Sequence, residues 1–530
     1  MTKEQQVWAH EEGTPPHSLA DYGIKEKASG SALVKPAFEG HQVELERNFS
    51  MLSALGLAFA LLNSWTAMSA SLSVVLPSGG SVSMLWGLLT SAFGAMVMAL
   101  SLAEITHNLP MSGGQYDWTY IMAPAGYKNG LSFFTGWMAN AGWIALVATA
   151  SSLGANFVYG VAYLWKEFEP APYQNFLLYL AFTLWATLLN VFGIHLLPIV
   201  DSTAGLWSLV GIVVVIITLL ACSSGHYQPA KDVFARWTNT TGWPDGMAFI
   251  LGLLQSTFGL TGFDAVTHMI EEMPRPSKNA PKVMVIAVIL GSTTSFVFMV
   301  VILFCLRDWD EVLTSTTGPL LQVYYQATNS KIGGTCLIVF NIGSMLFAAQ
   351  GLTTVASRML LSFVRDRGLG KLSRPLEPVH PKLKVPVWCI LFVSGWVGCF
   401  GLIELGSSVA LNAILSASLV FLQISYFVPI FLLLIRGDRA FNNYNNDAVW
   451  SLGKWRRPIN AMALIFITVT TVVFLFPPFI PVTSASQMNF VVVVFGIVMV
   501  MCLATWLIDG RKHFNGPSDL NMRLAMGKEA

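Results

Sequence analysis

Apolar segments long enough to cross a bilayer recur twelve times along the chain. Each contains few charges, and polar stretches or stretches with Pro and Gly separate most neighbours. The pattern predicts an all-α membrane protein with twelve transmembrane helices, and the shortest connection is expected at 193–197. The predicted spans are 50–72, 83–103, 130–160, 175–193, 197–221, 247–270, 283–305, 332–357, 386–403, 408–435, 459–480 and 487–508.

The sixth segment is interrupted near its middle. Gly259 and Gly262 weaken the helix where no water can satisfy free backbone groups, and Asp264 follows within the span. The first segment has its own polar interruption at residues 63–66. Because the two breaks lie five helices apart, and five is odd, the two halves of the chain are expected to have opposite topology. Paired interrupted helices predict a cargo site between the repeats of a transporter.

Composition supports the membrane class and argues against other classes. Charged residues make up 11% of the chain, against about 25% in a typical soluble domain. A net charge of +1 gives no basic surface for nucleic acid. The six cysteines show neither metal spacing nor a disulfide framework. Since no Gly-x-Ser-x-Gly, His-Glu-x-x-His or paired-Cys motif is found, we expect no enzyme activity, catalytic residue, metal or cofactor.

The charge of the loops predicts the orientation. If the N-terminus is inside, the inner loops hold sixteen basic residues and the outer loops hold five. Both termini are therefore expected in the cytoplasm, and the glycosylation sequon at Asn239 falls in an outer loop. The polar first 48 residues predict no cleaved signal peptide. The expected organisation is a tail at 1–48, a transporter domain at 49–510 and a second tail at 511–530.

Several stretches, spread over about residues 45–510, match a known family. The chain resembles the amino acid–polyamine–organocation superfamily, and within it the fungal amino acid/choline transporter family. Gly370 departs from the family, which often has Pro there, but the position is an inner loop. The matching stretches are LPSGG at 76–80, AE at 103–104, LPMSGGQYDW at 109–118, GFDAVTHMIEE at 262–272, SRM at 357–359 and FVRDRGL at 363–369.

The resemblance implies a five-plus-five inverted-repeat transporter fold. Helices 1–5 and 6–10 would form the two repeats, and helices 11 and 12 would be peripheral. Helices 1 and 6 would be unwound around the cargo. Members of the family import choline, ethanolamine, 4-aminobutyrate or amino acids across fungal plasma membranes, usually driven by the proton gradient.

The break in helix 1 consists of Asn63, Ser64, Trp65 and Thr66. Many superfamily members have an open glycine-rich turn here that exposes N–H groups to a substrate carboxylate. Bulky residues in this chain favour amines over α-amino acids, and the face of Trp65 suits a quaternary ammonium group. The alternative is that Trp65 packs between helices.

Asp264 is the leading candidate in helix 6. It is expected to hold a cationic amine or to take part in proton coupling, because ionisable residues inside a membrane are usually functional. The alternative is that it caps the inner half of the helix. The other predicted cargo-binding residues are Asn140, Gly259, Thr261, Gly262 and Phe263.

Further charged residues suggest coupling and gating. His268 lies four residues after Asp264 on the same helix face, which suits a proton relay or a structural role. Glu104, Glu271, Glu272 and Arg358 are predicted to form an inner gate, or else to be solvated loop charges. Thr353 and Thr354 occupy the depth where sodium-coupled relatives of this fold bind sodium, although such hydroxyls also bond to the preceding helical turn.

The sequence therefore predicts a secondary transporter in the plasma membrane that moves a small organic amine, choline-like cations first, with protons as coupling ion. The alternative cargo is an amino acid or 4-aminobutyrate, or a specialised nitrogenous metabolite. A nutrient sensor is less consistent with the short tails, and a channel is less consistent with a binding break in the middle of a helix.

Overall fold

The computed structural model describes residues 56, 58–59, 61–168, 171–405, 410–441, 450–484, 488–518, 520–521 and 523–524. Across these residues the regular elements are helices, and the one β-contact is an isolated bridge between Ser78 and Asn239. The predicted tail at 1–48 and the start of the first predicted span lie outside the described residues.

Among the described residues, eleven helices are long and apolar enough to span a bilayer. The broken first segment, α3 (Ser64–Ala70) and α4 (Leu72–Val75), supplies the twelfth, which confirms the predicted fold class. The long helices are α5 (Gly80–Asn108), α7 (Lys128–Lys166), α8 (Pro172–Phe192), α9 (Leu197–Cys222), α11 (Asp245–Gly259) with η3 (Phe263–Glu272), α12 (Pro276–Cys305), α15 (Lys331–Arg365), α17 (Val387–Gly401) with η5 (Leu402–Leu405), α18 (Ala410–Arg436), α19 (Arg456–Val473) and α20 (Val491–Thr505).

Some boundaries differ from the prediction for clear reasons. Helix α15 continues to Arg365 rather than ending near residue 357, because Arg358 is buried and paired with Glu272. Helix α19 ends at Val473 rather than near residue 480, since consecutive prolines follow at 477–478. The short connection at 193–197 is confirmed as a single turn, η2 (Ile194–Leu196).

The two breaks meet in the middle of the bundle. Gly262 adopts a positive φ of 102°, and Asn63, at the start of α3, has a φ of 41°. A Cβ atom at Gly259 would lie 2.5 Å from Met68 Cγ of α3. Glycine at 259 is therefore what allows helices 1 and 6 to touch at their interruptions.

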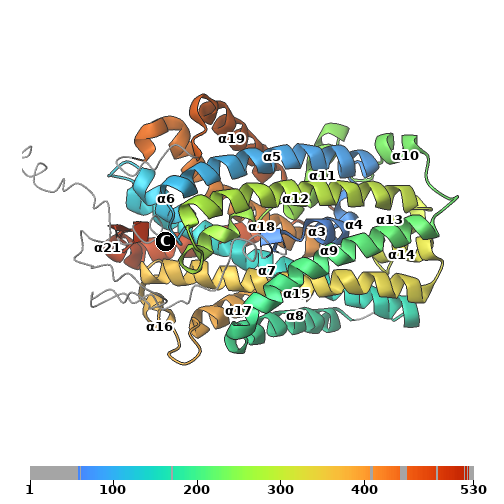
Figure 1. Ribbon diagram of the computed structural model, residues 1–530, viewed down its shortest axis with the longest axis horizontal. Helices are drawn as coiled ribbons and strands as arrows, with labels where there is room; N and C mark the ends of the chain where they lie inside the picture. The colour runs from blue at the N-terminus through green and yellow to red at the C-terminus, as the bar shows by residue number, and fades with distance from the viewer. Residues whose placement is uncertain are drawn as a thin grey trace, which may run out of the picture.

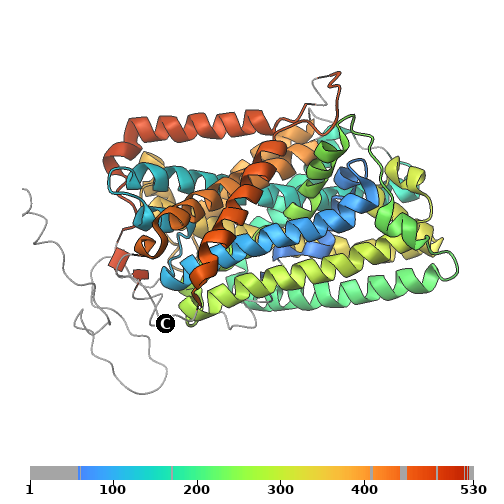
Figure 2. The same ribbon diagram turned by 90° about the horizontal axis from the view of Figure 1, so that it is seen from above.

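The helix contacts repeat at an offset of five helices. Helix 1 (α3) packs on helix 7 (α12), just as helix 6 (α11) packs on helix 2 (α5). Likewise helix 5 (α9) packs on helix 8 (α15), as helix 10 (α18) packs on helix 3 (α7). This is the pairing that a five-plus-five inverted repeat produces. Helix α20 lies along one edge of the bundle, where it is drawn in red (Figure 2).

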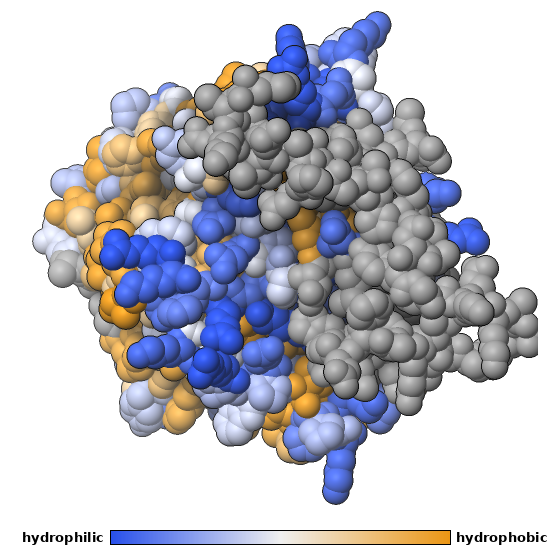
Figure 3. All heavy atoms as spheres, turned by 90° about the vertical axis from the view of Figure 1, so that its left-hand side faces the viewer, coloured by the Kyte–Doolittle hydropathy of each residue, from blue (hydrophilic) through white to orange (hydrophobic). Residues whose placement is uncertain are grey.

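The bundle has two distinct ends (Figure 1). One, the predicted outer end, carries α10 (Ala230–Ala235), α13 (Trp309–Leu313) and α14 (Pro319–Thr328). The other, the predicted inner end, carries α6 (Gln115–Met122), α16 (Ser373–Leu376) and α21 (Arg511–His513). Seen from the inner end, hydrophilic residues gather in the middle, and hydrophobic residues show toward the margin (Figure 3). That distribution is expected when lipid surrounds the bundle.

The described residues of the predicted C-terminal tail at 511–530 contact the bundle. Phe514 is fully buried, with its ring centroid 5.3 Å from that of Phe133. Arg523 and Leu524 are buried as well. The described part of the C-terminal segment is therefore packed onto the inner end.

Candidate functional site

A small cavity of about 20 Å³, room for about one water, lies beside the two helix breaks. Its wall is mostly apolar, with Asn63 and Thr261 as polar members and Phe258 as the aromatic one. Cargo larger than water would therefore need the surrounding helices to move apart. The lining residues are Leu61, Leu62, Asn63, Ala67, Leu146, Ala150, Phe258, Thr261, Met345, Ala348 and Leu352.

Asn63 is the most informative residue of this wall. Its side chain is 2% exposed, and neither its amide nitrogen nor its amide oxygen has a hydrogen-bond partner in the protein. Buried polar groups without a partner are uncommon, because each forfeits hydrogen bonds that water would provide. Since Asn63 lines the cavity, it is suited to receive a polar group of cargo or a water. Thr261 donates its hydroxyl to the carbonyl oxygen of Thr257 at 2.7 Å and can still accept.

The other residues of the helix 1 break are Ser64, Trp65 and Thr66. Trp65 is fully buried, donates to Ser208 Oγ at 2.8 Å and packs edge-on against Phe298. It is not among the residues that line the cavity, so its contacts favour the helix-packing interpretation. The hydroxyls of Ser64 and Thr66 are buried without a hydrogen-bond partner.

Asp264 lies outside the cavity wall, in a buried polar cluster on its inner side. Tyr426 donates to Oδ1 at 2.5 Å, and Gln115 Nε2 donates to Oδ2 at 2.6 Å. His268 Nε2 lies 3.6 Å from the same Oδ2. These partners are side chains rather than backbone N–H groups of η3, which disfavours the capping alternative. We call Asp264, Gln115, His268 and Tyr426 the carboxylate cluster.

Two members of this cluster were missed by sequence reasoning. Gln115 stands within the motif at 109–118, which marked its neighbourhood but not its role. Tyr426 lies on α18, 162 residues from Asp264 in the sequence, and no local pattern distinguishes it. Only the packing of helices 6 and 10 brings it to the carboxylate.

The remaining predicted cargo residues surround the two sites without lining the cavity. The ring of Phe263 packs against Tyr426, with centroids 5.7 Å apart. Asn140 donates to the carbonyl oxygen of Gly136 at 2.8 Å, and its own amide oxygen is buried without a partner. Gly259 and Gly262 shape the backbone of the break, as described above.

Three of the four residues predicted for an inner gate, Glu271, Glu272 and Arg358, make polar contacts between η3 and its neighbours, and their gating role stays a prediction. Arg358 pairs with Glu272 at 3.2 Å, which joins α15 to η3. Glu271 accepts from Ser112 Oγ at 2.6 Å. Glu104 is not part of this group, because its side chain faces α19 and pairs with Arg456 at 2.9 Å.

Comparison with known proteins places these features in a family. The family model described as "Amino acid permease" matches residues 49–501. The chain belongs to this family. It is 34% identical to the choline transporter of Saccharomyces cerevisiae over 480 residues, which cover 89% of this chain and 83% of that protein. It is 27% identical to the amino-acid permease BAT1 of Arabidopsis thaliana (90% and 94% covered) and 27% identical to the swainsonine transporter swnT of Arthroderma benhamiae (89% and 93% covered).

The permease is therefore a multi-pass membrane transporter. The hydroxyls of Thr353 and Thr354 on helix 8 were predicted either to bind sodium or to bond within the protein. Thr353 donates to the carbonyl oxygen of Ala349 at 2.8 Å, and Thr354 donates to Asn190 Oδ1 at 2.6 Å. Both hydroxyls are engaged within and between helices, which favours the structural interpretation over sodium binding. Within the described residues, no group of three or more His, Cys, Asp or Glu is arranged to hold a metal.

The sequon at Asn239 of this permease lies at the predicted outer end. The Asn239 amide nitrogen donates to Trp243 O at 2.8 Å and to Asp245 Oδ1 at 2.9 Å, while its oxygen accepts from Thr241. A glycan on this nitrogen would have to replace these bonds, so glycosylation stays a prediction that the folded geometry disfavours.

Proposed function

We propose that this permease is a proton-coupled secondary transporter of small organic amines in the plasma membrane, with choline-like cations as the first candidate cargo. Both termini would face the cytoplasm. The observation that carries the proposal is the cavity at the helix 1 and helix 6 breaks. It has an aromatic wall at Phe258, an unpartnered amide at Asn63 and no charged side chain among its lining residues.

An amine cation suits this cavity for electrostatic reasons. A ring face attracts a quaternary ammonium group, and an amide oxygen can accept from a hydroxyl. The nearest acidic group along the chain is Asp264, three residues after the cavity residue Thr261. A carboxylate in a low-dielectric interior makes the region more favourable to a cation. The similarity to a protein named choline transporter supports the same cargo class.

We assign the coupling proton to the carboxylate cluster. Asp264 and His268 are fully buried, and His268 is the ionic partner of Asp264 in the described part of the chain. The other partners of Asp264, Gln115 and Tyr426, are neutral donors. A proton that arrives at this pair therefore changes the local charge by a full unit, next to the gate residues of η3. Alternating access would then follow when η3 leaves its inner partners.

An amino acid or 4-aminobutyrate is the second candidate, and one observation favours it. The hydroxyls of Ser64 and Thr66 are buried without partners at the helix 1 break, beside the unpartnered amide of Asn63. Such groups can bind a substrate carboxylate at an exposed helix end. Similarity to an amino-acid permease and to a swainsonine transporter agrees with an amino acid or a specialised nitrogenous metabolite.

Competition uptake distinguishes these cargo classes. The permease is expressed in cells that lack their own amine permeases, and uptake of labelled choline is measured against unlabelled choline, 4-aminobutyrate and neutral amino acids. Choline-like amines should compete best, and imposing an inward proton gradient should accelerate uptake. If amino acids compete better than choline across the panel, the second candidate replaces the first.

A further inference from the structure

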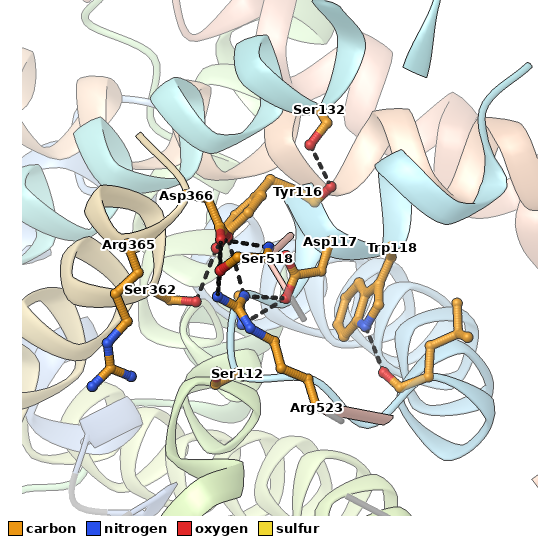
Figure 4. Close-up of polar contacts among 12 residues, drawn as sticks. Ser112, Tyr116, Asp117, Trp118, Ser132, Ser362, Arg365, Asp366, Ser518 and Arg523 are labelled. Carbon is orange, nitrogen blue, oxygen red and sulfur yellow. Dashed lines mark hydrogen bonds and ion pairs between the residues drawn. The ribbon is translucent and has the colours of Figure 1, made fainter. Parts of the chain in front are cut away.

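The C-terminal segment carries a buried ionic cluster at the predicted inner end (Figure 4). Arg523 donates to both oxygens of Asp366, at 3.1 and 2.9 Å, so the pair is bidentate. Arg523 Nη1 also lies 3.7 Å from Asp117 Oδ2. All three side chains are buried. One arginine of the C-terminal segment thus joins the end of α15 to α6.

Hydrogen bonds and apolar contacts complete this cluster. Ser518 donates its backbone N–H and its hydroxyl to Asp366 Oδ1, each at 2.8 Å, and Tyr116 donates to Asp366 Oδ2 at 2.7 Å. Phe514 is buried against Phe133. We call Phe514, Ser518, Arg523 and Leu524 the C-terminal brace. Its four residues are buried or half-buried, so the segment is docked rather than loosely attached.

The two aspartates that Arg523 contacts are connected to the residues that bind Glu271. Asp366 follows Arg365, whose Nη1 lies 3.8 Å from Glu271 Oε2. Asp117 accepts from the backbone N–H of Gly113 at 3.1 Å, and Gly113 follows Ser112, which donates to Glu271.

Arg365 is therefore adjacent in sequence to Asp366, and Ser112 is adjacent to Gly113, whose backbone N–H is held by Asp117. His268 also reaches this loop, through Ser112 O at 3.1 Å. The same short loop thus receives two side chains of η3, and Asp117 fixes its position.

We propose that Arg523 is a positioning residue of the inner gate. By holding Asp366 and Asp117, it keeps Arg365 and Ser112 where Glu271 of η3 binds them when the inner end is closed. Without Arg523, Asp366 loses its buried cation and both anchors are free to shift. The closed inner gate then loses its fixed partners, and the transporter populates the inner-open conformation more often.

Cysteine labelling at Thr267 tests this proposal. Thr267 lies on η3 and is fully buried, and its hydroxyl oxygen would be 3.2 Å from a Cβ atom at Gly114. A cysteine introduced by Thr267→Cys is therefore shielded while the gate is closed. Labelling by a membrane-permeant maleimide is followed in the full-length protein, with the same chain lacking Thr267→Cys as background.

Arg523→Gln should raise the labelling rate at position 267 by about fivefold, the size typical of mutations that shift such an equilibrium. Arg523→Lys, which keeps the charge but loses the bidentate geometry, should lie between Arg523→Gln and the parent. Arg511→Gln removes an exposed arginine in the same part of the chain and should label at the parent rate. Equal rates for Arg523→Gln and Arg511→Gln would overturn the proposal.

Two further measurements keep the outcome unambiguous. Cys305 is buried at the end of α12, so its labelling reports general loosening. An equal rise at Cys305 and at position 267 would reduce Arg523 to a structural role and contradict the proposal.

A second variant is used if Arg523→Gln does not reach the membrane. Ser518→Ala removes one hydroxyl bond to Asp366 and should raise the labelling rate at position 267 by less than Arg523→Gln would. An unchanged labelling rate in Ser518→Ala contradicts the proposal. The proposal rests on the transporter function, but labelling needs no cargo, so a wrong cargo assignment would leave this test intact.

Discussion

The Tyr426 hydroxyl donates a 2.5 Å hydrogen bond to Asp264 Oδ1, although the two residues are 162 positions apart in the sequence. Tyr426 belongs to helix 10 and Asp264 to the inner half of helix 6. In a five-plus-five fold these helices belong to the same repeat, at its two ends. The bond therefore ties the interrupted helix to a continuous one beside the cavity, and movement of η3 must break it or carry Tyr426 along.

Asp264→Asn is expected to abolish uptake while surface expression stays normal. Asn keeps the shape and can still accept from Tyr426, but it removes the charge that we assign to coupling and to cation attraction. Uptake of labelled amine and surface biotinylation are measured in parallel. Asp310→Asn, at an exposed acidic residue of the outer end, serves as control. Near-normal uptake by Asp264→Asn would remove this carboxylate from the mechanism.

Tyr426→Phe is expected to lower the maximal uptake rate by about tenfold or more, because a hydrogen bond to a charged group contributes about 1.5–3 kcal/mol. The ring contact with Phe263 remains, so the fold should be kept. Initial uptake rates over a range of cargo concentrations separate this effect from binding. Tyr324→Phe, which removes a buried hydroxyl bonded to Asn341 in the outer half, provides the matched control. Equal losses in the two variants would argue against a specific role for Tyr426.

The fold was largely predictable because each element is encoded locally. The apolar runs predicted the spans, and Gly259, Gly262 and Asn63 predicted the breaks, since backbone conformation at a break depends on the residues that form it. Boundaries failed where long-range pairs extend a helix, as Arg358 with Glu272 does.

The site was less predictable, because its contacts join helices that are remote in sequence. Asp264 was identified because a carboxylate is unusual within an apolar span, but Tyr426 and Gln115 carry no such signal. Glu104 was assigned to the wrong partners, since sequence alone does not tell which helix faces Arg456. Trp65 looked like a cation site because its type fits the chemistry, whereas its direction toward Ser208 depends on tertiary packing.

Phe258→Ala is expected to weaken choline binding about 30-fold, which corresponds to a cation–π contribution of about 2 kcal/mol. Phe258 lines the cavity, and Trp65 does not. Trp65→Phe should therefore change choline affinity much less, although it lowers the stability of the fold because the hydrogen bond to Ser208 is lost. Half-saturation constants for choline uptake in the two variants provide the measurement. A larger loss in Trp65→Phe would restore Trp65 as the cargo-facing ring.

The orientation is predicted from the basic residues of the loops, sixteen on the predicted inner side and five on the outer. Epitope tags at the two termini should be inaccessible to antibody on intact cells and accessible after permeabilisation. A tag inserted after Gly225, at the predicted outer end between α9 and α10, should be accessible on intact cells. Detection of a terminal tag without permeabilisation would invert the topology.

Asp117 is expected to make the stability of the permease depend on pH. Burial raises the pKa of Asp117 to about 7, opposed by Arg523 and assisted by Asp366, and Tyr116 lies beside it. Asp117 lies in α6, outside the spanning segments. Because the folded protein retains a proton that the unfolded chain releases near pH 4, the contribution of Asp117 to the free energy of unfolding falls as pH rises between about 4 and 7. This contribution falls by at most about 1.4 kcal/mol per pH unit, and above pH 7 it no longer changes with pH.

Asp117→Asn should remove this pH dependence of the free energy of unfolding. Thermal unfolding of the purified protein at pH 5, 6, 7 and 8 measures it, and an identical pH dependence in the parent and in Asp117→Asn would show that Asp117 is ionised throughout.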